Sequence, residues 1–234
     1  MIKILKGFFE RKMVVMLVAI VLVFVVLFNS GMFGGKDVHT HITCVGDSLT
    51  YGSGVLKNRD TDSYPAQLQA KLGTSYQVEG FGLRNATASE SGDLPYLQSK
   101  EYKASLKSNP DIVLVMIGTN DSKTYNWNPE DYKAGLEKIV TSYKELKSQP
   151  TVYLLKSPYC YATDGTDIAQ YDIQPAVVKD EVLPIIDEVA AEQGIEVIDL
   201  YELTEGEDSL YTDGIHFNKK GYSLLADTIE DKIK

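Results

Sequence analysis

The sequence has little cysteine and little histidine: 2 cysteines and 3 histidines in 234 residues. Two cysteines are too few for a disulfide scaffold. Cys44 lies in one expected strand and Cys160 lies beyond another, and a strand between them would hold them too far apart to bond, so we expect two free thiols. His39 and His41 stand two residues apart with no third ligand nearby. They indicate the exposed start of a strand rather than a metal site.

Basic residues are the minority, with 23 Lys and Arg against 33 Asp and Glu and a net charge of −10. Residues 1–12 hold four basic residues and one acidic residue, so residues 13–234 carry −13. This acidic body argues against nucleic acid as a partner and against adsorption on anionic lipid headgroups. It suits a soluble enzyme domain that acts on neutral or small substrates.

Long apolar runs are absent from most of the chain, but one occupies residues 13–28 and extends to residue 33. At 1.5 Å per residue, the segment 13–33 spans about 31 Å, which is enough for a bilayer core. We predict a transmembrane signal-anchor at 13–33, with a cytoplasmic basic segment at 1–12 and a tether at 34–39. The basic flank places the rest of the chain outside the cytoplasm. A cleaved signal peptide and a secreted protein are the alternative, although Asn29-Ser30-Gly31 is a poor cleavage site.

The remaining residues, 40–234, alternate between strand and helix signals and fit one domain. Apolar runs predict strands at 42–46, 76–81, 111–117, 151–155 and 195–200. Helical spacing predicts helices at 64–73, 97–106, 129–149, 177–193 with a kink at Pro184, and 218–233. Five such alternations predict an α/β fold, a three-layer α/β/α sandwich around a five-stranded parallel sheet.

Three polar or small residues follow predicted strand ends: Ser48, Gly82 and Asn120. Ligands of such sheets bind beyond the carboxyl ends of the strands. A serine held there is a candidate nucleophile, but its hydroxyl needs a base to take its proton. His216, with Asp213 three residues before it, is the candidate base, because one tight turn can aim both side chains at Ser48.

Four ordered blocks carry a resemblance to a known family: Gly46-Asp47-Ser48-Leu49, then Gly82, then Gly118-Thr119-Asn120-Asp121, then Asp213-Gly214-Ile215-His216. Together they resemble the SGNH (GDSL) hydrolase superfamily, and the resemblance covers residues 40–234. It implies a flavodoxin-like sandwich. Gly80 and Asn85 depart from the pattern, because family members often carry Asn and Gly at those places, so the shape of this loop stays open.

The resemblance implies a serine ester hydrolase that works through an acyl-enzyme. Ser48 is the implied nucleophile, His216 the general base and Asp213 its orienting partner. The oxyanion hole is expected from the backbone N–H groups of Ser48 and Gly82 and the side-chain amide of Asn120. No metal and no organic cofactor are implied. The oligomeric state stays open.

The string from Gly118 to Lys123, followed by Asn126-Trp127, is similar to a family subset associated with carbohydrate ester hydrolysis. We therefore expect removal of short acyl groups, above all acetyl, from carbohydrates, including glycans of the cell envelope. Asp47, Trp127 and Tyr159 are candidate substrate contacts, although Trp127 serves equally well as helix packing. The alternatives are a lipolytic esterase, a lysophospholipase or thioesterase, or a non-catalytic carbohydrate-binding protein. The polar, aromatic loop 157–173 favours sugars over lipids.

Overall fold

Five parallel strands form one sheet in the order β2-β1-β3-β4-β5 within residues 39–234, which are the residues that the computed structural model describes. The strands are β1 Thr40–Gly46, β2 Tyr76–Gly82, β3 Ile112–Met116, β4 Thr151–Leu155 and β5 Glu196–Ile198. The register pairs Gly46 with Gly82 on one side and with Met116 on the other. The carboxyl ends of the three neighbouring strands therefore reach the same edge, as the sequence predicts.

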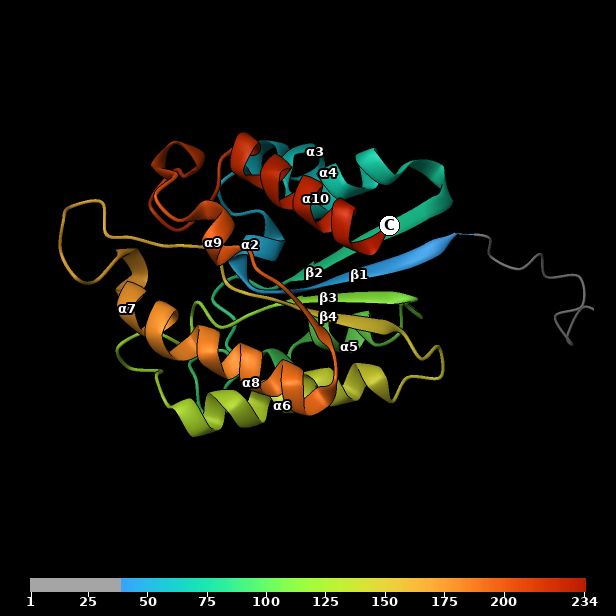
Figure 1. The fold of residues 1–234 in the computed structure, drawn as a ribbon, viewed down its shortest axis with the longest axis horizontal. Helices are drawn as coiled ribbons and strands as arrows, with labels where there is room; N and C mark the ends of the chain where they lie inside the picture. The colour runs from blue at the N-terminus through green and yellow to red at the C-terminus, as the bar shows by residue number, and fades with distance from the viewer. Residues whose placement is uncertain (1–38) are drawn as a thin grey trace, which may run out of the picture. The chain divides into compact units, whose positions relative to one another are not determined.

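Helices cover both faces of the sheet and complete three layers (Figure 1). One face carries α3 Arg59–Asp62, α4 Tyr64–Leu72 and α10 Lys219–Ile233, and the other carries α5 Lys100–Ser105, α6 Pro129–Lys144 and α8 Leu183–Gln193. The short helices α2 Ser48–Tyr51, α7 Pro175–Val177 and α9 Tyr201–Thr204 lie toward the carboxyl ends of the strands. This arrangement confirms the predicted three-layer sandwich and leaves the carboxyl edge to loops and short helices.

Two hydrophobic clusters fill the spaces between the sheet and its helices. Val113 and Val115 belong to one cluster, and Leu114 and Met116 to the other. Successive strand side chains point to opposite faces, and both faces are buried, which is why β3 is a continuous apolar run. Cys44 lies in the second cluster. Both cysteines are free and buried, as predicted, and burial raises the pKa of each thiol to about 12.

The predicted helix at 177–193 is divided in the structure. It comprises α7, a π-helical turn at Val178–Val182, and α8, which begins at Leu183. Pro184 has no backbone N–H to donate, and the wider turn before it accommodates the missing hydrogen bond. The predicted helix at 97–106 is also interrupted, because the Ser99 side chain accepts from the Tyr102 N–H and starts α5.

None of the helices within residues 39–234 is long and apolar enough to cross a membrane. The predicted transmembrane segment 13–33, its basic flank 1–12 and nearly all of the tether lie outside the described residues. Membrane anchoring therefore stays a prediction.

Candidate active site

Ser48 is the first residue of α2, directly after the end of β1. The chain turns sharply there. A Cβ atom on Gly46 would lie 2.0 Å from the Met116 carbonyl oxygen, so only glycine fits this close approach. Asp47 caps α2, because its Oδ1 accepts a hydrogen bond of 2.9 Å from the Leu49 N–H. The turn holds the Ser48 hydroxyl in place, and Ser48 as a residue is 8% exposed.

A chain of hydrogen bonds connects Ser48 to His216 and His216 to Asp213. The Ser48 Oγ lies 2.9 Å from His216 Nε2, and His216 Nδ1 lies 2.7 Å from Asp213 Oδ2. The other carboxylate oxygen of Asp213 accepts from the backbone N–H groups of Ile215 at 3.0 Å and His216 at 2.7 Å. The expected tight turn is thus present, and it aims both side chains at the serine. This is the geometry of an activated serine nucleophile.

The Asp213 side chain carries the negative charge that a positively charged His216 needs nearby. Burial pushes the pKa of Asp213 upward, but hydrogen bonds from the His216 side chain and backbone and from the Ile215 N–H leave it below its ordinary value. The carboxylate is therefore ionised at neutral pH. It can stabilise the imidazolium that forms when His216 takes the serine proton.

A small cavity of about 80 Å³ lies over Ser48. It is lined by Ser48, Arg84, Asn85, Thr119, Asn120, Tyr171, Ile173, Ile215 and His216. A cavity of about 150 Å³ is known to hold a benzene ring, so this space suits a much smaller group. It is placed to receive the reacting carbonyl and a short acyl chain.

Asn120 lies in this cavity, where the sequence predicts it. Its side chain is 5% exposed, and its Nδ2 donates to the Ala86 carbonyl oxygen at 3.1 Å. An amide nitrogen carries two hydrogens, so this bond fixes the group and leaves a second N–H for a ligand. Asn120 can therefore donate to an oxyanion beside Ser48 without being ionised.

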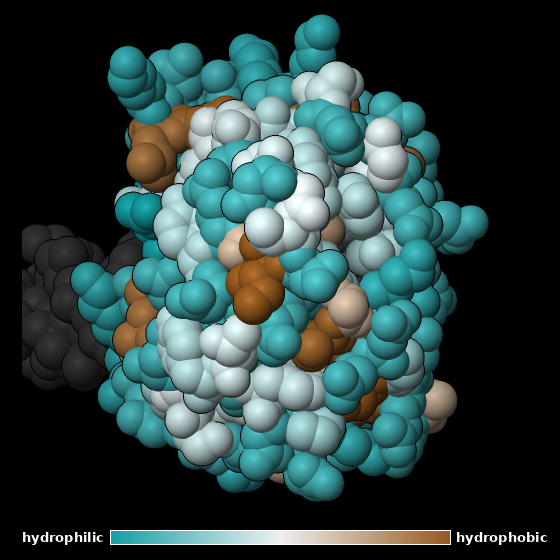
Figure 2. Space-filling view, turned by 90° about the vertical axis from the view of Figure 1, so that its left-hand side faces the viewer, coloured by the Kyte–Doolittle hydropathy of each residue, from teal (hydrophilic) through white to brown (hydrophobic). Residues whose placement is uncertain are grey.

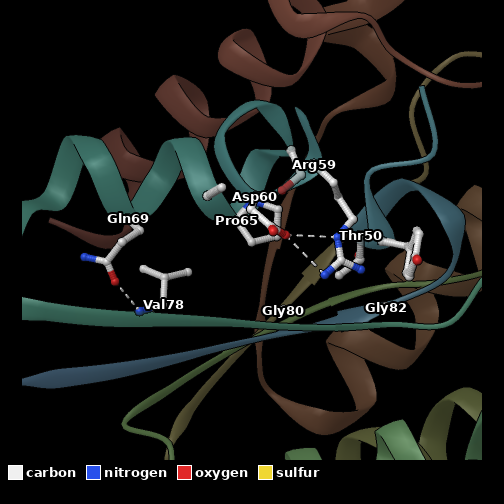
Figure 3. A pocket seen from close by; sticks show the side chains of 11 residues that line it. Thr50, Arg59, Asp60, Pro65, Gln69, Val78, Gly80 and Gly82 are labelled. Atoms are coloured by element: carbon white, nitrogen blue, oxygen red, sulfur yellow. Dashed lines mark hydrogen bonds and ion pairs between the residues drawn. The ribbon is translucent and has the colours of Figure 1, made fainter. Parts of the chain in front are cut away.

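Gly82 is not brought to the cavity over Ser48. A Cβ atom at this position would lie 2.2 Å from the Tyr51 backbone nitrogen, so the glycine is needed for packing between β2 and α2. Gly82 lines a separate pocket of about 290 Å³ under α3 and α4, which Figure 3 shows with Thr50 and Arg59. The predicted oxyanion role of Gly82 does not fit this placement.

Asn85 lies at the cavity over Ser48, where we expected Gly82. It lines the cavity, and within the described residues its backbone N–H has no hydrogen-bond acceptor. Its φ of 66° lies in the left-handed region, which Asn adopts more readily than most other residues with a side chain. The sequence does contain a signal: related proteins often carry Gly at this place, and Gly and Asn share this backbone preference.

A buried carboxyl connects the loop of Asn85 to the end of β3. Asp121 Oδ2 accepts from the Ala88 N–H at 3.0 Å, and Asp121 Oδ1 accepts from the Ser89 N–H at 2.8 Å. Burial raises the pKa of Asp121 to about 7, although these two hydrogen bonds oppose the shift. Together with the bond from Asn120 to Ala86, the carboxyl fixes the loop that carries Asn85.

The three predicted substrate contacts lie away from the reacting centre or are buried. Asp47 is 1% exposed and caps α2. Trp127 donates to Glu181 Oε2 at 3.0 Å and packs on Tyr132, with ring centroids 5.8 Å apart. Tyr159 stacks on Tyr161. Sequence reasoning missed these placements because they depend on which way each ring turns within its loop or helix.

Tyr171, from the predicted aromatic loop, is the ring that stands at the site. It contacts the His216 ring edge to face at 5.7 Å and is 51% exposed. It lines both the small cavity and a neighbouring cleft of about 510 Å³. Its φ of 61° is uncommon for a residue with a side chain, and such conformations concentrate at functional sites.

The fold and the hydrogen-bonded triad define a serine hydrolase of the α/β class. The GDSL-like Lipase/Acylhydrolase family matches residues 44–224, and the chain belongs to this family. The resemblance drawn from the four sequence blocks is thereby confirmed: residues 44–224 form a domain of the GDSL acylhydrolase family.

The chain is also similar to individual proteins. It is 34% identical over 212 residues to an acetylxylan esterase of Xylanibacter ruminicola, a match that covers 85% of this chain and 44% of that protein. The chain thus spans less than half the length of this relative. A carbohydrate acetylesterase structure from Sinorhizobium meliloti superposes with a TM-score of 0.65 at 21% identity, covering 83% of this chain and 98% of the other. An acetyl xylan esterase structure gives a TM-score of 0.64 at 19% identity, with 83% and 100% covered. These two structures confirm the fold.

Proposed function

We propose that the protein is a carbohydrate acetylesterase that transfers the acetyl group of a sugar ester first to Ser48 and then to water. The observation that carries this proposal is the hydrogen-bonded chain from Ser48 through His216 to Asp213 beside a cavity of about 80 Å³. Similarity to an acetylxylan esterase over 85% of the chain supports the substrate class.

The first half of the reaction forms the acyl-enzyme. The Ser48 Oγ attacks the ester carbonyl carbon, and its proton passes to His216 Nε2. The negative charge then moves to the carbonyl oxygen, which accepts hydrogen bonds from the Asn120 amide and from the backbone N–H groups of Ser48 and Asn85. Collapse of this intermediate breaks the bond to the sugar, whose oxygen takes the proton from His216.

The second half restores the enzyme. A water molecule gives a proton to His216 Nε2 and attacks the acetyl carbon, and the same donors hold the oxyanion. Ser48 leaves and takes the proton back, and acetate departs. Asp213 keeps the imidazole oriented throughout, because its two oxygens are held by the His216 ring and by the turn. Residues 39–234 supply every proton acceptor that this cycle needs.

The surroundings of the triad favour a sugar over a long acyl chain. Figure 2 shows the face at the carboxyl ends of the strands, where hydrophobic residues form separate spots among hydrophilic ones rather than one continuous groove. The large exposed apolar side chains lining the cleft are Leu56 and Tyr171. An exposed tyrosine can pack against a sugar ring while its hydroxyl stays in water. We therefore assign to Tyr171 the aromatic substrate contact that the sequence suggested for Trp127.

The proposal is tested by measuring acetate release by the full chain from acetylated xylo-oligosaccharides, and p-nitrophenol release from p-nitrophenyl acetate and from p-nitrophenyl esters of longer acids. We expect turnover of acetyl esters that falls as the acyl chain lengthens, and loss of roughly 10⁴-fold or more in Ser48→Ala. Preference for long acyl chains would instead favour the lipolytic alternative. Sugar binding by a folded protein with no turnover would favour the non-catalytic one.

We also propose that residues 13–33 anchor the enzyme with its catalytic domain outside the cytoplasm. The proposal rests on the apolar run and its basic flank. The full chain should stay in the membrane fraction after a carbonate wash, and a variant without residues 13–33 should not. A shortened form in the medium would show that the segment is a cleaved signal peptide.

A further inference from the structure

Two cationic side chains face the cleft beside the catalytic residues. Arg84 and Lys57 both line the cleft of about 510 Å³, together with Tyr171 and His216. Arg84 also lines the small cavity over Ser48, so it stands where the two spaces meet. Among residues 39–234, neither Arg84 nor Lys57 has an ion-pair partner.

The carboxylates of the same cleft have their oxygens occupied. Asp62 Oδ1 lies 3.0 Å from Lys219 Nζ, and this partner holds the pKa of Asp62 below its ordinary value. The oxygens of Asp213 accept from the His216 ring and from its own turn, although its negative charge remains. With Lys219 counted, three cations and two carboxylates give the cleft a charge of +1, although the whole chain carries −10.

Arg59, the other arginine that the structure describes, provides a contrast. It lies in the separate pocket of Figure 3, where its guanidinium pairs with Asp60 at 3.4 Å and stands 4.5 Å above the centre of the Tyr51 ring. Its charge has partners within the chain. Arg84 lines the cleft and has no ion-pair partner within residues 39–234.

We propose that Arg84, assisted by Lys57, binds an anionic group of the glycan, a carboxylate or a phosphate, next to the sugar whose acetyl group enters the cavity. The guanidinium presents parallel N–H donors that match either oxyanion. This proposal rests on the proposed carbohydrate esterase function and narrows its substrate class. It departs from the expectation of neutral substrates drawn from net charge, because the charge of the cleft differs in sign from that of the whole chain.

The test compares substrates that differ in one anionic group. One pair is an acetylated xylo-oligosaccharide with a glucuronic acid branch and the same compound with its carboxylate reduced to an alcohol. The other pair is an O-acetylated hexosamine with and without a phosphate. For the wild-type full chain at low salt, we expect kcat/KM about tenfold higher for at least one charged partner. This preference should shrink in roughly 0.5 M salt, because salt screens exposed charges. The pair that shows the preference identifies the anion.

Variants of Arg84 test whether this residue causes the preference for charged substrates. Arg84→Gln should abolish it, mainly through KM for the charged substrate, and Arg84→Lys should retain part of it. Arg59→Gln is the matched control, because it makes the same change in a pocket without catalytic residues, and it should leave the preference as in wild type. Equal kcat/KM for both members of each pair, or an Arg84→Gln preference equal to that of wild type, would overturn the proposal.

A binding measurement separates this proposal from the proposed function. Calorimetric titration of Ser48→Ala with the same pairs needs no turnover. Tighter binding of a charged partner that is lost in the double variant Ser48→Ala/Arg84→Gln supports the anion site even where wild type releases no acetate. Equal binding of charged and neutral partners contradicts the anion site even where wild type is an active esterase.

Discussion

At the scale of single residues, Asn85 combines an unusual backbone with a functional position. Its left-handed φ of 66° turns the chain so that it lines the cavity over Ser48. Asn85→Gly keeps both the conformation and the N–H, so we expect kcat within a few-fold of wild type. Asn85→Val strains the backbone by about 1–2 kcal/mol and moves the donor, so kcat should fall by about 10²-fold. Steady-state kinetics and urea unfolding of both variants check this. A folded Val variant with wild-type kcat would exclude the Asn85 N–H as an oxyanion donor.

Asn120 gives a second prediction at this scale, since its free N–H is aimed at charge that develops only during the reaction. Asn120→Ala should lower kcat by about 10²–10³-fold and change KM little. Thr119→Ala, which alters the neighbouring lining residue without removing an amide donor, is the control and should lower kcat much less. Equal losses in the two variants would indicate a general effect of cavity lining.

The buried Asp47 carboxyl should make the unfolding free energy of the domain depend on pH. Burial raises its pKa to about 6, against the opposing hydrogen bond from Leu49, and its Oδ2 has no partner. The folded state therefore holds a proton that the unfolded chain releases near pH 4. The stability from this proton is present below about pH 4 and is lost as pH rises to about 6. The Asn side chain of the Asp47→Asn variant cannot ionise. Between about pH 4 and about pH 6, the unfolding free energy of this variant should therefore fall less than that of wild type, and the difference should be on the order of 2 kcal/mol. Urea unfolding at several pH values measures this, and parallel pH profiles for the two proteins would contradict it.

At the scale of elements, the loop after β2 is held by residues at the end of β3. Asp121→Ala removes the acceptors of the Ala88 and Ser89 N–H groups, so the loop should loosen and displace Asn85. We expect kcat to fall by about tenfold or more with KM little changed. Asp131→Ala is the matched control, because Asp131 accepts from the Ser91 N–H farther along the same loop and lines neither the cavity over Ser48 nor the neighbouring cleft. It should preserve kcat. Comparable losses of kcat in both variants would show that the loop is not specifically held by Asp121.

The same elements show how far sequence reasoning extends. All five strands and the triad were predictable, because strands buried in a parallel sheet are apolar runs and the catalytic residues follow strand ends or share one turn, although β5 is shorter than the predicted 195–200. The placement of Asn85 rather than Gly82 at the cavity over Ser48 was not predicted, because the path of the loop depends on Asp121, which lies 33 residues away from Ala88 in the chain. The position of Trp127 depended similarly on its hydrogen bond to Glu181, 54 residues away. Contacts of this kind leave no periodic pattern in the sequence.

At the scale of the whole molecule, esterase activity should depend on whether the whole domain is folded. Ser48 and His216 are hydrogen-bonded although they lie 168 residues apart in the chain. Helix α10, which follows His216, packs against α4. Trp127, the one tryptophan, lies at the start of α6 on the other side of the sheet. We expect the urea transitions followed by Trp127 fluorescence and by esterase activity to coincide, because a single sheet connects the two sides of the domain and single domains commonly unfold as one cooperative unit. Loss of activity at lower urea would instead show that the cleft loops open locally.

The separation of 168 residues between Ser48 and His216 also bears on protein synthesis. A ribosome adds Ser48 to the chain 168 residues before His216, so over that stretch of synthesis the growing chain holds a nucleophile without the base that activates it. Ester hydrolysis can begin only after His216 has left the ribosome and reached Ser48. Fragments from interrupted translation that end before Asp213 are therefore inert as esterases, and the cell is not exposed to an active but incomplete enzyme.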